Sequence, residues 1–324
     1  MRDMLILYLI LMQIFFTKCE GEMNFDQLIE YLKKDIKMKK LAVAGADNPE
    51  TLETSRLAKD MKIGDSILIG NEERIKIRAK EKGLDISDFQ IVNIDDPIEI
   101  CRYSVKIVHN GEADILVKGS VETRDLLKAI LDDEIGLKSK ELMNLIGVFD
   151  IEGKLTFLTD ISVIPYPTLE NKVQLINNAV KLARSIGYKM PKAAALAGLS
   201  ISNIKMPETM EAEKLKEMNV KGEIKDCIVD GPLSLDLAIS PESAHIKYVN
   251  RRINGDADIL LFPDVHAANL SYKILTHLSG SKNGNILLGT TKPVISTSRS
   301  DSVQTKLNSI ILGFWFDKLN SQNN

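Results

Sequence analysis

The sequence predicts an α/β protein of two related α/β domains with a cleft between them. From about residue 40 onward, short apolar runs alternate with amphipathic stretches, the pattern of βαβ units around a largely parallel sheet. The chain has 324 residues, more than a single core usually holds. Its second half also echoes its first, since Gly111-Glu-Ala-Asp-Ile-Leu returns as Gly255-Asp-Ala-Asp-Ile-Leu and segment 41–53 resembles 195–211.

The expected elements follow from these apolar runs. The first half holds four strands, at 41–46, 66–70, 89–94 and 113–119, separated by helical segments. A hairpin with a tight turn at Glu152-Gly153 then replaces the crossovers over 145–160, which marks a domain junction. Strands at 193–199, 227–233, 257–265 and 286–290 alternate after it with helices at 169–186, 208–219, 267–279 and from about 302. The predicted domains are 23–146 plus 289–324, and 147–288.

The N-terminal segment 1–22 is treated as a hydrophobic extension. Its apolar run, Leu5 to Phe16, resembles a signal-peptide core and is shorter than the ~20 residues of a membrane-spanning helix. The alternative is a mis-assigned start, because Met23 stands directly before a well-capped helical segment. We favour Met23 as the functional start.

Composition excludes several classes of protein. Lys and Arg total 42 against 45 Asp and Glu, so no basic excess indicates nucleic-acid binding. Cys19, Cys101 and Cys227 are far apart, which favours a reducing, cytoplasmic compartment over a disulfide framework. The four histidines have no metal-ligand spacing, and neither GxGxxG, GxxxxGK[ST] nor GxSxG occurs in the candidate loops. We therefore expect no metal site.

The segment 294–302 is the first candidate site. It ends an apolar strand and opens a helix, where backbone N–H groups and the helix dipole favour an anion. Ser298, Ser300 and Ser302 can donate hydrogen bonds to phosphate, and Arg299 offers a bidentate fork. The alternative is a helix cap with a surface arginine.

Three further loops follow predicted strands. Asn269 and Lys273 lie four residues apart on one helix face and can hold phosphate or a nucleotide, while Asp264 or Asn269 can instead cap that helix. Lys118-Gly119 ends a first-half strand, where a lysine can meet phosphate or simply extend to solvent. Asp230-Gly231 is mainly a turn signal whose position after a buried strand makes it a candidate.

Five blocks of the sequence occur in a recognisable order: KGSVETRDLLKAIL, FLTD with an apolar-Pro stretch, VDGPLSLDLAI, GDADILLFPD with AANLSYK, and PVISTSRSDSVQTKL. Together they resemble the phosphate acetyl/butyryl transferase family, most closely its phosphate butyryltransferase branch. The resemblance runs from about Met23 to Leu312. It implies a fold like that of the isocitrate and isopropylmalate dehydrogenases, and reversible transfer of a short acyl group between coenzyme A and phosphate. It implies acyl-CoA and phosphate as substrates, no tightly bound cofactor and a homo-oligomer.

The resemblance also implies roles for single residues. Ser298 and Arg299 match the family's Ser-Arg pair, for hydrogen bonding and for binding phosphate or the developing oxyanion. The acetyl branch has an Asp base six positions after the Arg, where this chain has Thr305, so the base is open and Asp301 is the nearby candidate. Ala268 and Ile164 replace a Gly and an Asn of the family, which favours a larger or more apolar acyl pocket.

The alternatives are phosphate acetyltransferase or broad acyl specificity, and a non-catalytic coenzyme A-binding protein. A metal-dependent hydroxy-acid dehydrogenase on the same kind of fold is disfavoured by the lack of a clustered Asp motif.

Overall fold

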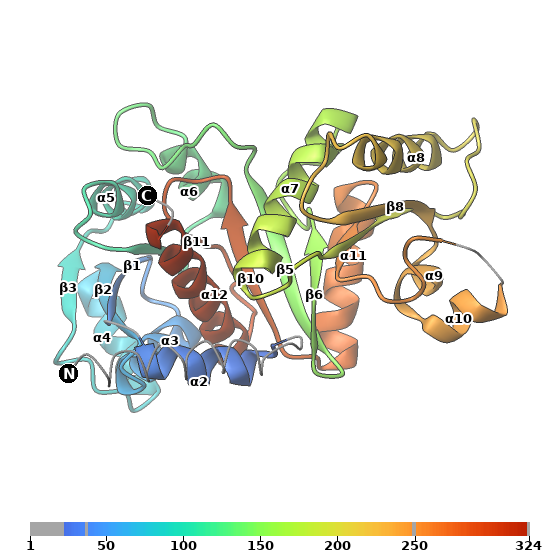
Figure 1. Ribbon diagram of the computed structural model, residues 1–324. Coiled ribbons are helices and arrows are strands. Elements are labelled where there is room, and N and C mark those ends of the chain that lie inside the picture. The colour runs from blue at the N-terminus through green and yellow to red at the C-terminus, as the bar shows by residue number, and fades with distance from the viewer. Residues whose placement is uncertain (1–22, 36–37, 248–250, 323–324) are drawn as a thin grey trace, which may run out of the picture.

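The computed structural model describes residues 23–35, 38–247 and 251–322, and these form helical layers on both faces of one mixed sheet of eleven strands (Figure 1). The predicted α/β class is confirmed. The strand order is β3-β2-β1-β4-β11-β10-β5-β6-β9-β7-β8. The strands are β1 (Lys39–Ala44), β2 (Gly64–Gly70), β3 (Gln90–Asn93), β4 (Ile115–Lys118), β5 (Asn144–Ile151), β6 (Lys154–Thr159), β7 (Lys192–Leu196), β8 (Ile228–Leu233), β9 (Ile259–Leu261), β10 (Asn283–Leu288) and β11 (Val294–Ile295).

Two parallel blocks of strands are joined by antiparallel pairing at the centre of the sheet. Strands β3, β2, β1, β4 and β11 run parallel to one another, as do β6, β9, β7 and β8. Strands β5 and β10 pair antiparallel with each other and with β6 and β11. The predicted hairpin is the β5–β6 pair, and its turn residues Glu152 and Gly153 have φ of 53° and 88°. Because the sheet runs unbroken across the expected junction, the domain bounds stay a prediction.

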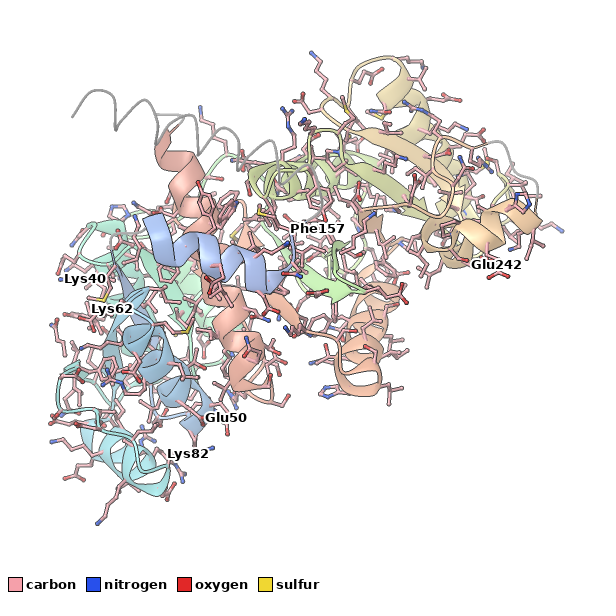
Figure 2. The ribbon with its side chains drawn as sticks, turned by 60° about the horizontal axis from the view of Figure 1, so that its bottom comes forward. Lys40, Glu50, Lys62, Lys82, Phe157 and Glu242 are labelled. Carbon is pink, nitrogen blue, oxygen red and sulfur yellow. The ribbon has the colours of Figure 1, made fainter. Side chains whose placement is uncertain are left out.

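Helices cover both faces of the sheet, and most of them bury one apolar side against it. Helix α12 (Val303–Gln322) differs, because residues 305–317 are buried on all sides. One core lies under α2 (Phe25–Asp35), α3 (Pro49–Asp60), α4 (Glu72–Glu81), α7 (Leu169–Ser185), α8 (Pro207–Val220) and α12. The other lies under α5 (Pro97–His109), α6 (Thr123–Ile130), α9 (Leu235–Ile239), α10 (Pro241–Ile246) and α11 (Val265–Ile274). Phe157 of β6 is fully buried, whereas Lys62, Lys82 and Glu242 are exposed (Figure 2).

Two sequence expectations about helices need correction. The helix expected over 267–279 starts earlier, at Val265, and its last turn is a π-helix, Leu275–Ser279. The short helices α9 and α10 were not expected, since five or six residues are too few to display a helical period.

The internal repeats fall on equivalent parts of the two blocks. The Pro-Glu-Thr triplets at 49–51 and 207–209 open α3 and α8, which follow β1 and β7. The repeated Ala-Asp-Ile-Leu leads into β4 and β9, which pair directly with β1 and β7. Each repeat therefore builds the same strand–helix unit and its neighbouring strand.

The C-terminal helix α12 lies over the half of the molecule that holds the first block, beside β11 and β10 (Figure 1). It packs on β10 and also contacts α3, α2 and α7. This approach is close: a Cβ atom at Gly284 of β10 would lie 2.9 Å from backbone atoms of Asn308 and Ser309. The glycine thus lets α12 reach the sheet and fixes the loop that precedes the helix.

The expectations about segment 1–22 and Cys19 lie outside the described residues. In the part that the structure describes, no helix has both the length and the apolarity to cross a membrane.

Candidate active site

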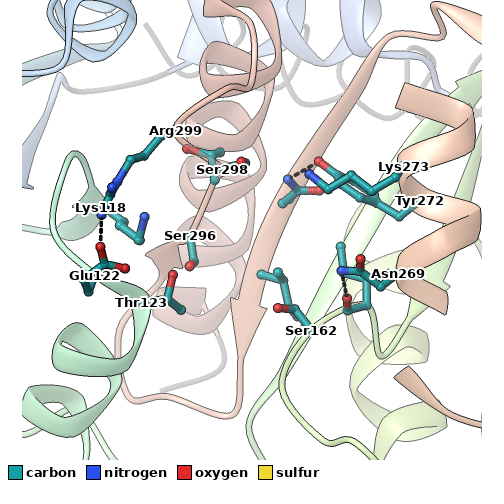
Figure 3. A pocket seen from close by; sticks show the side chains of 14 residues that line it. Lys118, Glu122, Thr123, Ser162, Asn269, Tyr272, Lys273, Ser296, Ser298 and Arg299 are labelled. Carbon is teal, nitrogen blue, oxygen red and sulfur yellow. Dashed lines mark hydrogen bonds and ion pairs between the residues drawn. The ribbon is translucent and has the colours of Figure 1, made fainter. Parts of the chain in front are cut away.

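A cavity of about 340 Å³ opens over the middle of the sheet, between the loops after β4 and β11 on one side and α11 with the loop after β6 on the other (Figure 3). Its lining residues are Lys118, Glu122, Thr123, Leu145, Ile161, Ser162, Asn269, Tyr272, Lys273, Asn285, Ser296, Thr297, Ser298 and Arg299. Three of these carry a positive charge and one carries a carboxylate.

The loop that carries Ser298 is held from behind by buried charged groups. The Ser298 N–H donates to Asp301 Oδ2 at 2.7 Å, and Lys306 Nζ donates to the carbonyls of Ser298 and Asp301 at 2.7 and 3.0 Å. Asp301 is 1% exposed and does not line the cavity. The Thr305 N–H donates to Ser302 Oγ at 3.1 Å, so Ser302 caps α12. This leaves Asp301 as an internal anchor of the loop.

Arg299 points across the cavity mouth to Glu122, with which it forms an ion pair (Figure 3). Both side chains are about half exposed or more, at 51% and 69%. Glu122 precedes α6 at its N-cap position but makes no side-chain cap bond, because its carboxylate reaches Arg299 instead. The start of α6, with Thr123 as its first residue, therefore faces the cavity without the usual cap.

Lys118 ends β4 and extends toward the loop of Ser296 and Ser298 (Figure 3). It is 4% exposed. Its ammonium group makes no hydrogen bond or ion pair with any residue that the structure describes. Burial, and then the charge of Arg299, lower the pKa of Lys118.

The opposite wall is built around Asp160, which is 3% exposed. Its carboxylate accepts the N–H groups of Leu145, Ser162, Val163 and Ile164 at 2.6 to 3.2 Å, which fixes the loop after β6. Burial raises the pKa of Asp160 above the ordinary value even though these bonds act in the opposite sense.

Two polar contacts hold α11 against the loop after β6 and against β10. Asn269 Nδ2 donates to the carbonyl of Ile161 at 2.9 Å, and Asn285 Nδ2 donates to the Tyr272 hydroxyl at 2.8 Å. Burial raises the pKa of Tyr272. The Nζ atom of Lys273 lies 5.2 Å from the centre of the Tyr272 ring. The wall thus presents Asn269, Tyr272 and Lys273 to the cavity from one helix.

Five of the residues expected from the sequence meet at this cavity: Lys118, Asn269, Lys273, Ser298 and Arg299. Gly119, Ser300, Asp301 and Ser302 lie in the adjoining loops but not on the lining. Asp264 caps α11, because its side chain accepts the N–H of Ala267 at 2.9 Å. Ala268 is fully buried and Ile164 is partly buried, and neither lines the cavity.

The positions of Asp230 and Gly119 have structural explanations. Asp230, on the edge strand β8, is fully buried and accepts the N–H groups of Arg252 and Ile253 at 2.7 and 3.3 Å. A Cβ atom at the adjacent Gly231 would lie 2.8 Å from Ala195 Cβ. A Cβ atom at Gly119 would lie 2.0 Å from the carbonyl oxygen of Gly45, so this glycine is needed for strand packing. None of these three residues lines the cavity.

Sequence reasoning missed several lining residues. Glu122 and Thr123 follow the recognised Lys118-Gly119 pair, and Tyr272 precedes Lys273, so proximity along the chain could have found them. Asn285 and Leu145 gave no such signal, because each lies within an apolar strand and reaches the cavity only through strand order. No group of three or more metal-ligating side chains occurs among the described residues.

Comparison with known proteins identifies the family. The signature of the phosphate acetyl/butaryl transferase family matches residues 23–106 and 99–314. The chain belongs to the phosphate acetyl/butaryl transferase family. The resemblance found in its motifs is therefore confirmed, as is its enzyme class, acyltransferase.

Relatives within this family cover nearly the whole chain. Phosphate butyryltransferase of Clostridium beijerinckii is 44% identical over 89% of this chain and 96% of its own length. Phosphate acetyltransferase of Thermotoga maritima is 38% identical over 91% of this chain and 100% of its own. The crystal structure of a branched-chain phosphotransacylase from Enterococcus faecalis matches 86% of this chain and 99% of its own, with 31% identity and a TM-score of 0.78.

Proposed function

We propose that this chain catalyses butanoyl-CoA + phosphate = butanoyl phosphate + CoA, with other short acyl groups as poorer substrates. The observation that carries the proposal is the cationic cavity, in which Lys118, Lys273 and Arg299 face a single carboxylate, Glu122. Phosphate and coenzyme A are both polyanions, so this charge balance suits them. The identity to phosphate butyryltransferase, higher than that to phosphate acetyltransferase, supports the butanoyl preference.

Phosphate is assigned to the corner between Arg299, Lys118 and the start of α6. Arg299 offers a bidentate fork, and Lys118 is a buried cation without an anionic partner among the described residues. An uncapped helix start favours an anion in the same place. The phosphate site is therefore displaced from the start of α12, which Ser302 already caps.

Coenzyme A is assigned to the opposite wall, along Asn269 and Lys273. Attack of a phosphate oxygen on the thioester carbonyl builds negative charge, and Arg299 with the Ser298 hydroxyl is the group proposed to stabilise it, an effect on the order of several kcal/mol. Asp301 then supports catalysis by holding the Ser298 loop, since its carboxylate lies behind the cavity lining.

We also propose that the chain forms two α/β domains of the isocitrate dehydrogenase type around a cleft. We propose further that the protein is a cytoplasmic homo-oligomer that acts in butanoate metabolism. The grouping of strands into two parallel blocks on either side of β5 and β10 supports the two-domain arrangement.

The alternatives differ in acyl preference or in catalysis. Phosphate acetyltransferase or broad acyl specificity is the main alternative, given the 38% identity to the Thermotoga maritima enzyme. A non-catalytic coenzyme A-binding protein is the other alternative.

The lining favours an acyl group longer than acetyl over the first alternative. Leu145 and Ile161 give the cavity apolar surface that suits such an acyl chain.

The test is an assay of purified protein starting at Met23, with coenzyme A and acyl phosphates from acetyl to valeryl. We expect thioester formation with the highest kcat/KM for butyryl phosphate. Arg299→Gln should lower kcat/KM by about 10² to 10³. Arg102→Gln, which removes an exposed arginine paired with Asp132 at 2.9 Å, is the matched control and should retain activity. A folded protein with no thioester formation on any substrate contradicts the proposal.

A further inference from the structure

Lys118 differs from the other buried lysines of the described chain. Lys172 and Lys306 are as buried as Lys118, at 4% exposure each, but both have partners. Lys172 pairs with Glu211 at 2.5 Å, and Lys306 donates to two carbonyls. Lys118 has neither, and its side chain points into the cavity (Figure 3). Burial of an unpaired ammonium group is unfavourable, so this arrangement calls for either a bound anion or a neutral amine.

The proposed reaction, on which this inference rests, requires a proton transfer. Monohydrogen phosphate attacks the thioester, and the products are an acyl phosphate dianion and a neutral thiol. The proton of the phosphate hydroxyl must therefore end on the sulfur of coenzyme A. A side chain between the two substrates that can take up and return one proton would serve both steps.

The other titratable groups on the cavity lining are poorly placed for this task. The Glu122 carboxylate forms an ion pair with Arg299 at the cavity mouth. Arg299 itself cannot take up and return a proton, because an arginine side chain stays protonated. Tyr272 lies between Asn285 and Asp301, and burial raises its pKa. Lys273 lies on the far wall over the Tyr272 ring.

Two residues behind the lining are also occupied. Thr305 stands where the acetyl branch has its Asp, but it is buried and donates to Asn283 Oδ1 at 2.7 Å. Asp301 is covered by the Ser298 loop. Among the described residues this leaves Lys118.

We propose that Lys118 carries the proton between phosphate and the thiol of coenzyme A. Its neutral amine takes the proton from the attacking phosphate oxygen while that oxygen bonds to the carbonyl carbon. The carbon–sulfur bond then breaks, the electron pair stays on sulfur, and the Lys118 ammonium returns the proton to it. The reverse reaction follows the same steps backwards. The lysine ends in its starting form, so protons and electrons balance.

The surroundings of Lys118 suit this cycle. Burial and the charge of Arg299 lower its pKa, which makes the neutral amine accessible. The carboxylates of Glu122 and Asp301 and the thiol of Cys101 act in the opposite direction. Bound phosphate adds negative charge beside the amine, which raises the affinity of the amine for the proton of the attacking hydroxyl.

The experiment compares Lys118→Arg, Lys118→Ala and wild type in both reaction directions. Arginine keeps the charge but cannot release a proton at working pH, so Lys118→Arg should lower kcat by about 10² to 10⁴. Its KM for phosphate should stay within about threefold, since a phosphate-binding cation remains. Ethylamine should partly restore Lys118→Ala, with a rate that follows the free-base concentration. Lys172→Arg, equally buried but paired outside the cavity, is the control and should keep its activity.

The outcomes separate the two proposals. Loss of kcat in Lys118→Arg with amine rescue of Lys118→Ala supports proton transfer. The proton-transfer proposal is overturned if Lys118→Arg keeps a kcat within tenfold of wild type with a raised phosphate KM. It is also overturned if ethylamine does not rescue Lys118→Ala. In both cases an active wild type still upholds the proposed function. An inactive wild type contradicts the function itself. If the variants do not fold, NMR of the wild type with ¹³C-labelled lysine decides. The proposal then requires one lysine whose pKa is below 10.5 and changes when inorganic phosphate is added.

Discussion

The N–H group of Ser298 donates a hydrogen bond of 2.7 Å to the buried carboxylate of Asp301. The same carboxylate oxygen accepts a weaker bond, at 3.5 Å, from the hydroxyl of Tyr272 on the opposite wall. Its other oxygen, Oδ1, has no partner within the described residues. One side chain therefore connects the Ser298 loop to α11 beneath the cavity floor.

Asp301→Ala should uncouple these walls. It leaves the Ser298 N–H without its acceptor, which costs about 1 to 3 kcal/mol of stability. A shift of the loop by about 1 Å can also lower kcat/KM by about 10². Thermal unfolding and steady-state kinetics measure the two effects.

Asp132→Ala is the matched control for this variant. Asp132 also accepts backbone N–H groups, those of Glu134 and Ile135, but at the far end of α6. We expect it to lose stability without loss of kcat/KM. Equal kinetic losses in both variants would show that Asp301 has no particular effect on the cavity.

Glu122→Gln should strengthen phosphate binding. The Glu122 carboxylate pairs with the guanidinium group of Arg299, so phosphate bound at the proposed site must displace it. An exposed pair of this kind contributes roughly 0.2 to 1 kcal/mol, so the KM for phosphate should fall by about 1.5- to 5-fold. Glu141→Gln, which removes a surface pair with Lys181 at 3.3 Å, should leave it unchanged. A raised phosphate KM in Glu122→Gln would instead assign Glu122 to substrate binding.

The buried thiols should be inert at neutral pH. Burial raises the pKa of Cys101 and of Cys227 to about 11. At pH 8 only about one thiol in a thousand is then ionised, and the thiolate is the reactive form. A Cys19→Ser variant should resist iodoacetamide at pH 8 when folded and take up two labels when unfolded, as measured by intact mass.

The same shifts have a consequence for stability. A thiol with a raised pKa binds its proton more tightly in the folded state. Its contribution to the free energy of unfolding is therefore fully present below pH 9.0, the pKa of the thiol in the unfolded chain. The contribution is lost as the pH rises through about 11. The melting temperature should therefore fall between pH 9 and 11, and rapid labelling of the folded variant at pH 8 would contradict both expectations.

The sequence alone was sufficient for the fold class, the hairpin and five lining residues from both walls of the cavity. Strands, helices and turns depend on local periodicity and on residues such as Gly153, so they can be read along the chain. Lys118 ends a strand, and Ser298 and Arg299 follow one, and the ends of parallel strands are where ligands bind. Asp264 was correctly offered as a cap for the same local reason.

Tertiary structure decided which of these loops meet. The sequence treated the Asp230 loop and the Lys118 loop alike, because each follows an apolar strand. Strand order places β8 at the sheet edge and β4 beside β11, and only the second arrangement brings its loop to Arg299. The absence of a partner for the Lys118 ammonium within the described chain, and the pairing of Glu122 with Arg299, are likewise properties of packing. Local pattern determines what a segment becomes, whereas long-range packing determines which charges it faces.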